Sequence, residues 1–286
     1  MRISHWYLLF ILMIVIIYFF LYRFEGFQTE TEKQSKDINA IMKRSNIIFA
    51  STIRNSGNYI KKALDDVDRC GNKFKSYALI IYENDSVDST RNILQDNKKD
   101  NYHYLLEDDV KESRRTVRIS NGRNKILDKV KEINGDDYYD YLVMLDLDDI
   151  NHSGMFASSI DTCFKYDNWD VLTANQSTLY YDLWALRKKD DMEYDCWEKV
   201  RENTNIPDAE HVYVNSKFKN YPQGGLLEVD SAFGGAAIFK IRSIPDSCRY
   251  NGISSSGFET CEHVAFNTCL KEHGKSIYIN TEFITS

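Results

Sequence analysis

Short apolar segments alternate with amphipathic segments along most of the 286-residue chain. Apolar side chains recur at helical spacing over residues 60–67, 88–94 and 119–133, which predicts a helix at each place. The apolar runs that predict strands are residues 47–50, 77–82, 102–106, 141–145 and 236–241. Strands that alternate with helices in this way are typical of a mostly parallel sheet with helices on both faces. We therefore expect an α/β fold built on one such sheet.

The amino-terminal region differs from the rest. Residues 6–22 contain neither a charged residue nor a proline and reach the lower length limit for a membrane-spanning helix. No small-residue cleavage site follows, so an uncleaved single-pass signal anchor is favoured over a cleaved signal peptide. Such an anchor predicts an endomembrane or host-derived membrane, and Arg2 and Arg23 on its two sides leave the orientation open. Residues 23–45 predict a polar stem, and residues 46–286 predict one large domain.

Charge and cysteine content exclude some classes of partner. The formal net charge is -7, so the chain has no broad basic surface and a nucleic-acid partner is not expected. The six cysteines include no CxxC pair, so a zinc site through sulfur is not expected either. Their number allows both disulfides and buried free thiols, and the sequence does not separate these two possibilities.

Polar or acidic residues follow three of the predicted strands. They are Thr52 and Arg54 after the first strand, Glu83, Asn84 and Asp85 after the second, and Asp146 to Asp149 after the fourth. Ligands of open α/β sheets bind at the carboxyl ends of strands. Carboxylates such as Asp146 and Asp148 suit a hard divalent cation, Mn²⁺ or Mg²⁺, which offsets the charge of a diphosphate. A solvated Asp-rich turn is the alternative, and the position directly after an apolar strand favours the metal site.

These motifs and several later ones stand in an order that resembles the glycosyltransferase-A (Rossmann-like) fold of family 2 glycosyltransferases. The similarity is closer to the fungal capsule-associated mannosyltransferases and related viral or microbial enzymes, and it covers residues 46–286. The matching segments are residues 47–55, 83–90, 123–124, 146–149, 180–187, 231–235 and 261–263. The resemblance implies a metal-dependent glycosyltransferase, of hexosyltransferase type, with a nucleotide-sugar donor and a glycan, lipid or protein acceptor.

The resemblance also assigns residues to each part of the site. The donor-binding residues are Thr52, Arg54, Glu83, Asn84, Asp85, Arg123, Asn124 and Asp146, and the metal ligands are Asp146 and Asp148. The acceptor-binding residues are Asp182, Trp184, Arg187, Asp230, Phe233, Gly234 and Gly235. Aromatic faces stack on sugars, and glycines allow close approach of the backbone. The structural alternatives are core packing of the aromatic side chains and a tight turn at the glycines. Arg118 stays open between diphosphate binding and surface ion pairing.

The catalytic position departs from the related enzymes, in which a Glu-Asp pair is usual. Here the pair is Glu262-His263. Either Glu262 takes the proton from the acceptor hydroxyl, or His263 takes it or binds the metal. The alternative is an ordinary amphipathic helix over residues 261–270, in which Glu262 is only a first-turn charge. A histidine at a position that the resemblance marks as catalytic favours a role in the chemistry.

Two other functions fit parts of the sequence. A nucleotidyltransferase that forms a nucleotide sugar should carry a glycine-rich phosphate loop after its first strand, and residues 51–57 contain only Gly57. A membrane-tethered carbohydrate-binding protein with a decayed active site would not need the Asp146–Asp148 pair. Sequons occur at Asn84, Asn151 and Asn175, and the first two should carry no glycan if the site is correct.

Overall fold

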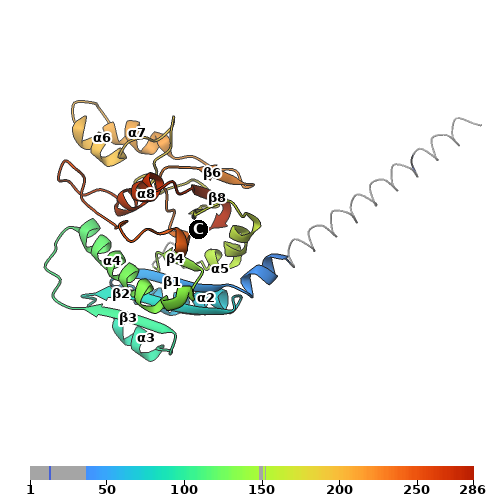
Figure 1. Ribbon diagram of the computed structural model, residues 1–286. Helices are drawn as coiled ribbons and strands as arrows, with labels where there is room; N and C mark the ends of the chain where they lie inside the picture. The colour runs from blue at the N-terminus through green and yellow to red at the C-terminus, as the bar shows by residue number, and fades with distance from the viewer. Residues whose placement is uncertain (1–12, 14–36, 148–150, 152) are drawn as a thin grey trace, which may run out of the picture. The chain divides into compact units, whose positions relative to one another are not determined.

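The computed structural model describes residues 13, 37–147, 151 and 153–286. Its compact unit from Met42 to Ser286 contains all the strands in Figure 1. The strands are β1 (Asn46–Ile53), β2 (Ser76–Asn84), β3 (Tyr102–Glu107), β4 (Tyr141–Leu145), β5 (Val171–Asn175), β6 (Leu226–Glu228), β7 (Ala236–Lys240) and β8 (Ile277–Ile284). The α-helices are α2 (Ile60–Gly71), α3 (Thr90–Asp96), α4 (Arg115–Ile133), α5 (Met155–Ser159), α6 (Cys196–Glu202), α7 (Ala209–Tyr213) and α8 (Glu262–Glu272). Short 3₁₀ helices cover Gly135–Asp137, Ile160–Lys165, Asn215–Lys217 and Ile241–Ser243.

The strands form one eight-stranded sheet in the order β3-β2-β1-β4-β7-β5-β8-β6. Strands β1 to β4 are parallel where they pair, and β5 is parallel to β8. However, β7 lies antiparallel between β4 and β5, and β6 is antiparallel to β8. The sheet is therefore mixed rather than purely parallel: four of its seven strand pairs are parallel, as a mostly parallel sheet predicts, and three are antiparallel. A strand that is buried on both faces has the same apolar pattern in either direction, so the sequence does not show how β7 runs.

The elements predicted from the first half of the chain are confirmed. The structure places β1 to β4 at the four predicted strands and extends β1 by three residues at its carboxyl end, to Ile53. Helix α4 begins at Arg115, four residues before Ile119, where the predicted apolar periodicity starts. Strands β5, β6 and β8 were not predicted.

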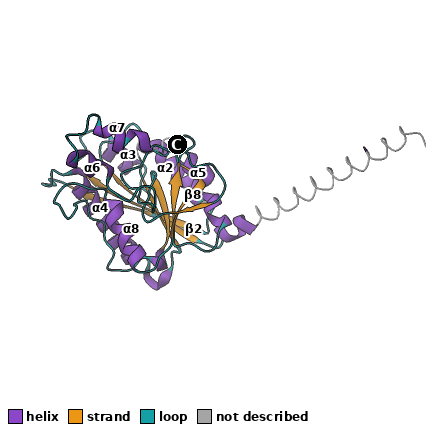
Figure 2. Cartoon of the chain, turned by 90° about the horizontal axis from the view of Figure 1, so that it is seen from above, coloured by secondary structure: helices purple, strands orange, loops and turns teal. Residues whose placement is uncertain are grey.

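Close packing of α4 against the sheet sets the position of the candidate site. Helices lie on both sides of the strands (Figure 2). A Cβ atom at Gly122 of α4 would lie 2.4 Å from the Tyr82 ring of β2 and 3.0 Å from Thr52. Only a glycine allows this approach, and the next residue, Arg123, is thereby held at the ends of β1 and β2.

The predicted membrane anchor lies outside the described residues, apart from Met13. In the described part of the chain, no helix has the length and apolar character needed to span a bilayer. The end of the predicted stem belongs to the compact unit, because Met42 is only 1% exposed. Lys43 Nζ also donates to the backbone oxygen of Asn72 at 2.8 Å.

The cysteines divide between the two possibilities that the sequence left open. Cys248 and Cys269 form a disulfide, and it joins the segment after β7 to α8. The other four cysteines are free and buried. Burial raises the pKa of the Cys70 thiol to about 12, so it stays protonated and unreactive at neutral pH.

Removing the disulfide should destabilise the protein. Its sequence separation is 21 residues, and cross-linking a loop of this size contributes about 3 kcal/mol through the entropy of the unfolded chain. We expect Cys248→Ala/Cys269→Ala to lower the free energy of urea unfolding by that amount. A thiol reductant should lower the stability of the wild type equally and leave the variant unchanged. Equal stability of variant and oxidised wild type would contradict the expectation.

The asparagines of all three sequons are buried. Asn84 is 6% exposed, and Asn151 and Asn175 are 0% exposed. The Asn151 amide donates to the backbone oxygens of Asp146 and Gly235, at 2.7 and 2.9 Å. The fold thus agrees with the expectation for Asn84 and Asn151 and extends it to Asn175, because a buried amide is inaccessible to a glycosylating enzyme.

Candidate active site

A cavity of about 590 Å³ lies at the carboxyl ends of β1, β2 and β4. Helix α4 and the start of α8 form further walls, together with segments that follow β5 and precede β7. The lining residues are Thr52, Ile53, Arg54, Ser56, Tyr82, Asn84, Arg115, Arg118, Ile119, Arg123, Asp146, Leu147, Tyr181, Asp182, Trp184, Phe233, Cys261, Glu262 and His263. The fold thus brings together the strand-end motifs and the Glu262-His263 pair.

Ten of the residues assigned from the sequence line this cavity. They are Thr52, Arg54, Asn84, Arg123, Asp146, Asp182, Trp184, Phe233, Glu262 and His263. The assigned residues that do not line it are Glu83, Asp85, Asn124, Arg187, Asp230, Gly234 and Gly235. Asp148 lies outside the described residues.

A buried arginine connects the metal motif to the catalytic pair. Arg123 is 3% exposed and forms ion pairs with Glu262, whose side chain is 8% exposed, and with Asp146 at 3.1 Å. Its guanidinium carbon lies 5.0 Å from the centre of the Phe233 ring and 5.7 Å from that of Tyr250. Two aromatic rings and two carboxylates therefore surround one cation, which fixes the spacing of Asp146 and Glu262.

His263 accepts a hydrogen bond from this arginine. Arg123 Nη1 lies 2.6 Å from His263 Nε2, and a guanidinium can only donate, so Nε2 carries no proton. The imidazole stacks on the Phe233 ring with centroids 3.7 Å apart. Burial and the neighbouring Arg123 charge lower the pKa of His263 well below its usual value. The neutral imidazole has a single acceptor nitrogen, and Arg123 already occupies it, so the geometry argues against His263 as the base.

The neutral state of His263 predicts a pH-dependent stability. Between the lowered pKa of the folded protein and the unfolded value near 6.5, the unfolded chain binds more protons, so stability falls as the pH drops below about 6.5. His263→Gln should remove this component, which amounts to at most about 1.4 kcal/mol per pH unit. Urea unfolding of both proteins at pH 7 and pH 5 measures the difference. Equal losses of stability in the two proteins would show that His263 does not titrate in this way.

Asp146 presents oxygen ligands to the cavity. Its side chain is 29% exposed, and carboxylate oxygens are the ligands that Mn²⁺ and Mg²⁺ prefer. The adjoining loop is held in place by hydrogen bonds. Asp146 N donates to Gly235 O at 3.0 Å, and the Asn151 side-chain amide donates to the backbone oxygens of both Asp146 and Gly235. Asp146 therefore fits a hard divalent cation and would hold it, and the second predicted ligand, Asp148, lies outside the described residues.

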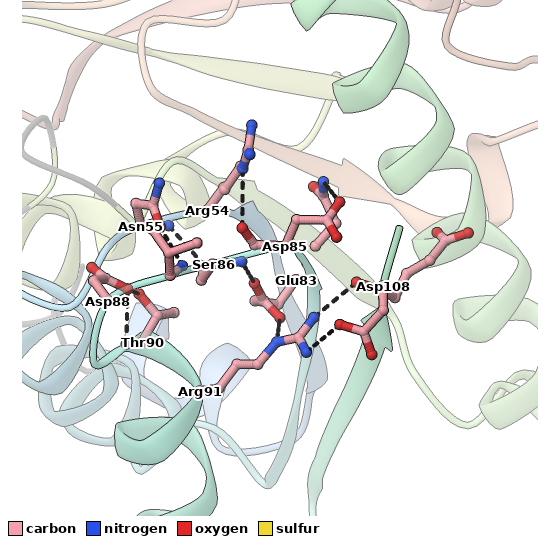
Figure 3. Close-up of polar contacts among 12 residues, drawn as sticks. Arg54, Asn55, Glu83, Asp85, Ser86, Asp88, Thr90, Arg91 and Asp108 are labelled. Atoms are coloured by element: carbon pink, nitrogen blue, oxygen red, sulfur yellow. Dashed lines mark hydrogen bonds and ion pairs between the residues drawn. The ribbon is translucent and has the colours of Figure 1, made fainter. Parts of the chain in front are cut away.

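Glu83 has a structural role. Its side chain is fully buried, forms an ion pair with Arg91, and accepts from Ser86 N at 2.8 Å (Figure 3). Arg91 also pairs with Asp108 at 2.5 Å. This network joins the loop after β2 to the end of β3 and leaves Glu83 no direct access to a donor.

Asp85 also shapes the loop after β2. It adopts a left-handed backbone conformation with φ of 50°, and its carboxylate accepts from the backbone amides of Asp109 and Val110, at 2.7 and 3.2 Å. The hydrogen bond from the Asn84 amide, together with these backbone bonds, lowers the pKa of Asp85. Arg54 Nε donates to the backbone oxygen of Asp85 at 3.4 Å (Figure 3). The Asp85 loop therefore supports Arg54 and Asn84, which line the cavity.

The acceptor-side residues form a second anchored loop. Asp182 Oδ2 accepts from Gly234 N at 3.0 Å, and burial raises the pKa of Asp182. Gly234 has φ of 67°, and a Cβ atom there would lie 2.4 Å from the backbone oxygen of Ala174. Gly234 and Gly235 thus form a tight turn that holds Phe233 and Asp146, and they do not face the cavity themselves.

The remaining assigned residues lie around the cavity or apart from it. Trp184 Nε1 donates to Asp195 Oδ2 at 2.9 Å, and Arg187 Nη2 lies 3.6 Å from the same oxygen. Arg187 and Asp230 line a separate cavity of about 660 Å³. Asn124 faces away from the site, because its side chain binds both the amide and the carbonyl oxygen of Tyr250. The structure therefore separates Asn124, Arg187 and Asp230 from the donor and metal motifs.

The sequence did not indicate that further arginines of α4 line the cavity beside Arg123. Arg115 and Ile119 precede Arg123 by eight and four residues, so all three share one helix face, and each lines the cavity. Residues four apart lie on the same face of a helix, so counting back from Arg123 in steps of four would have indicated Arg115. Arg118, which the sequence left open, also lines the cavity and forms no surface ion pair with a described residue.

No protein-family model and no curated protein matches the chain. Among solved structures, it is similar to a mannosyltransferase from Pyrobaculum calidifontis in complex with GDP-Man and Mn²⁺. That alignment has a TM-score of 0.46 and 11% identity, and it covers 84% of this chain and 56% of the other.

Two further solved structures show the same level of similarity. Glucosyl-3-phosphoglycerate synthase from Mycobacterium tuberculosis, in complex with UDP, aligns with a TM-score of 0.44 and 11% identity over 82% of this chain and 67% of that one. TarS from S. aureus aligns with a TM-score of 0.44 and 10% identity over 83% of this chain and 35% of that one. The chain thus spans about half the length of the mannosyltransferase and a third of TarS. At these scores, a functional assignment for this chain rests on its own site.

Proposed function

We propose that the chain is a metal-dependent glycosyltransferase that moves a sugar, of the hexose class, from a nucleotide-sugar donor to an acceptor hydroxyl. One observation carries the proposal: in one cavity at the ends of parallel strands, Arg123 connects a metal-type carboxylate, Asp146, to a second carboxylate, Glu262. This arrangement supplies both a place for a leaving diphosphate and a group that takes a proton.

The donor side is assigned to Thr52, Arg54 and Asn84 at the ends of β1 and β2. A divalent cation, when bound by Asp146 and Asp148, supplies the charge that stabilises the departing nucleoside diphosphate. Arg54 is exposed and offers a guanidinium fork for phosphate oxygens. Trp184, which is only partly buried, offers an apolar face for a sugar ring.

The acceptor side is assigned to Glu262. The Glu262 carboxylate takes the proton of the acceptor hydroxyl as the acceptor oxygen forms its bond to the sugar. The bond from that sugar carbon to the diphosphate breaks in the same step, and the nucleoside diphosphate leaves with the electron pair. Arg123 orients Glu262 through their ion pair, and neutral His263 holds Arg123 through Nε2. His263 is thus a positioning residue.

The proposal also covers the class of acceptor and the location of the protein in the cell. A glycan, lipid or protein hydroxyl suits the cavity, and attachment to an endomembrane or host-derived membrane through residues 6–22 would favour a membrane-bound acceptor. The resemblance to capsule-associated mannosyltransferases supports a hexose as the transferred sugar.

Nucleotide binding tests the proposal and separates its rivals. Isothermal titration of the full chain in detergent should show that UDP or GDP binds with Mn²⁺ and fails to bind after EDTA treatment. Tighter binding of nucleoside triphosphates, with release of pyrophosphate from a sugar 1-phosphate, would identify a nucleotidyltransferase instead. Binding of free sugars without any nucleotide requirement would identify a carbohydrate-binding protein.

A further inference from the structure

Two arginines that line the cavity form no ion pair in the described part of the chain. Arg115 and Arg118 line the cavity from the first turns of α4. Neither forms an ion pair with a carboxylate in the described part of the chain; Arg118 donates to the backbone oxygens of Glu112 and Ser113, at 3.2 and 3.0 Å. Arg123, by contrast, is neutralised by two carboxylates.

The nearby carboxylates are already engaged. Glu112 pairs with Arg114 at 2.7 Å. Glu259 accepts from the backbone amide and the hydroxyl of Thr116, at 2.9 and 2.8 Å. Neither glutamate forms an ion pair with Arg115 or Arg118. The bonds to Thr116 lower the pKa of Glu259, and the charges of Arg114 and Arg115 add to this at longer range.

Their location at the start of a helix is electrostatically unfavourable. Helix α4 has 19 residues, and its first turn contains no acidic residue. The amino end of a helix carries partial positive charge, which opposes cations and attracts anions. The chain as a whole has a net charge of -7, so a basic wall inside a cavity is a local feature. Together, the helix end and the two guanidinium groups favour an anion at this wall.

The anion site lies away from the metal motif. A helix rises 1.5 Å per residue, which places Arg118 and Arg115 about 7.5 and 12 Å along the axis from Arg123. Arg123 contacts Asp146, where the diphosphate is proposed to bind. The outer arginines are therefore placed for the second substrate.

We propose that Arg115 and Arg118 bind a phosphate or carboxylate group of the acceptor, so that the enzyme selects anionic acceptors. This inference rests on the proposed function. A neutral acceptor would leave both guanidinium groups without an anionic partner at the positive end of α4, whereas an anionic group forms charge-assisted hydrogen bonds with both.

The experiment compares two probes, glucose 6-phosphate and glucose, on the full chain saturated with Mn²⁺ and UDP or GDP. In the wild type, the phosphate probe should bind at least about tenfold more tightly, as expected for one charge-assisted contact. Arg115→Gln/Arg118→Gln should reduce this ratio to less than about twofold and leave nucleotide affinity unchanged. The control Lys129→Gln/Lys131→Gln removes two charges from the same helix, outside this cavity lining, and should keep the wild-type ratio.

Two results would overturn the inference. The wild type could bind both probes equally, or the arginine substitutions could weaken nucleotide binding about tenfold, which would assign the arginines to the donor diphosphate. Failure of the proposed function looks different. In that case the wild type binds no Mn²⁺-nucleotide, while an arginine-dependent preference for glucose 6-phosphate would still support the anion site.

Discussion

Replacing Arg123 with methionine should abolish turnover and lower the free energy of unfolding by about 3–5 kcal/mol. Methionine keeps an unbranched apolar stem between Phe233 and Tyr250 but removes the charge. The Glu262 side chain, 8% exposed, would then be a buried carboxylate without a cation. A buried carboxylate without a cation destabilises the folded state, which is why loss of one partner of a buried ion pair lowers the free energy of unfolding so strongly. Urea unfolding measures the stability, and release of nucleoside diphosphate measures the turnover.

A second substitution separates charge from packing. Arg123→Met/Glu262→Gln removes both charges of the pair and should recover part of the lost stability, although it stays inactive. Lys131→Met, also on α4, breaks an exposed ion pair with Asp246 and should leave the stability unchanged. A small effect of Arg123→Met, similar to that of Lys131→Met, would contradict the buried cluster.

Glu262→Gln should reduce turnover by about 10²–10⁴-fold, as expected for loss of a general base. The amide oxygen of glutamine still accepts a hydrogen bond from Arg123, which keeps its ion pair with Asp146. The variant should therefore stay folded, at lower stability, and keep its affinity for Mn²⁺-nucleotide. Turnover and nucleotide binding are measured on the same preparation.

The matched control for this substitution is Glu272→Gln. Glu272 is the last residue of the same helix, α8, and it is exposed. It should keep wild-type turnover. Near-normal turnover of Glu262→Gln would show that Glu262 is not the general base and would favour a retaining mechanism without a protein base.

Much of the fold follows from local patterns. The predicted strands β1 to β4 and the predicted helix α4 depend on apolar periodicity, which is a property of neighbouring residues. Strand direction is not local. Strand β7 pairs antiparallel with β4, nearly a hundred residues earlier in the chain, and both strands are almost wholly buried, so no alternation reveals the direction.

The site was predictable where a motif follows a strand. Arg54, Asn84 and Asp146 come directly after β1, at the end of β2 and after β4, and the geometry of a sheet brings them together. Side-chain partners were not predictable. Glu83 and Asn84 are adjacent, yet Glu83 pairs with Arg91 while Asn84 lines the cavity. Which of two neighbouring polar residues faces a cavity depends on contacts with β3 and α3 that the sequence does not display.

The resemblance could identify the catalytic pair but not the roles of its members. Glu262 and His263 both lie in the site, and both contact Arg123. Only the position of His263 Nε2 against a guanidinium shows that the imidazole is an acceptor held neutral. The missed Arg115 illustrates the same limit, because a lone arginine on a helix is usually solvated.

Release of nucleoside diphosphate from a panel of nucleotide sugars tests the central claim most directly. The wild-type full chain should release UDP or GDP from at least one donor with Mn²⁺, and EDTA should stop the release. Asp148→Asn should lower the metal-dependent rate at least about 100-fold with little change in stability, because a carboxylate after a strand end binds metal rather than supporting the core. Release that is unaffected by EDTA, or an Asp148→Asn variant with wild-type activity at saturating Mn²⁺, would contradict the account.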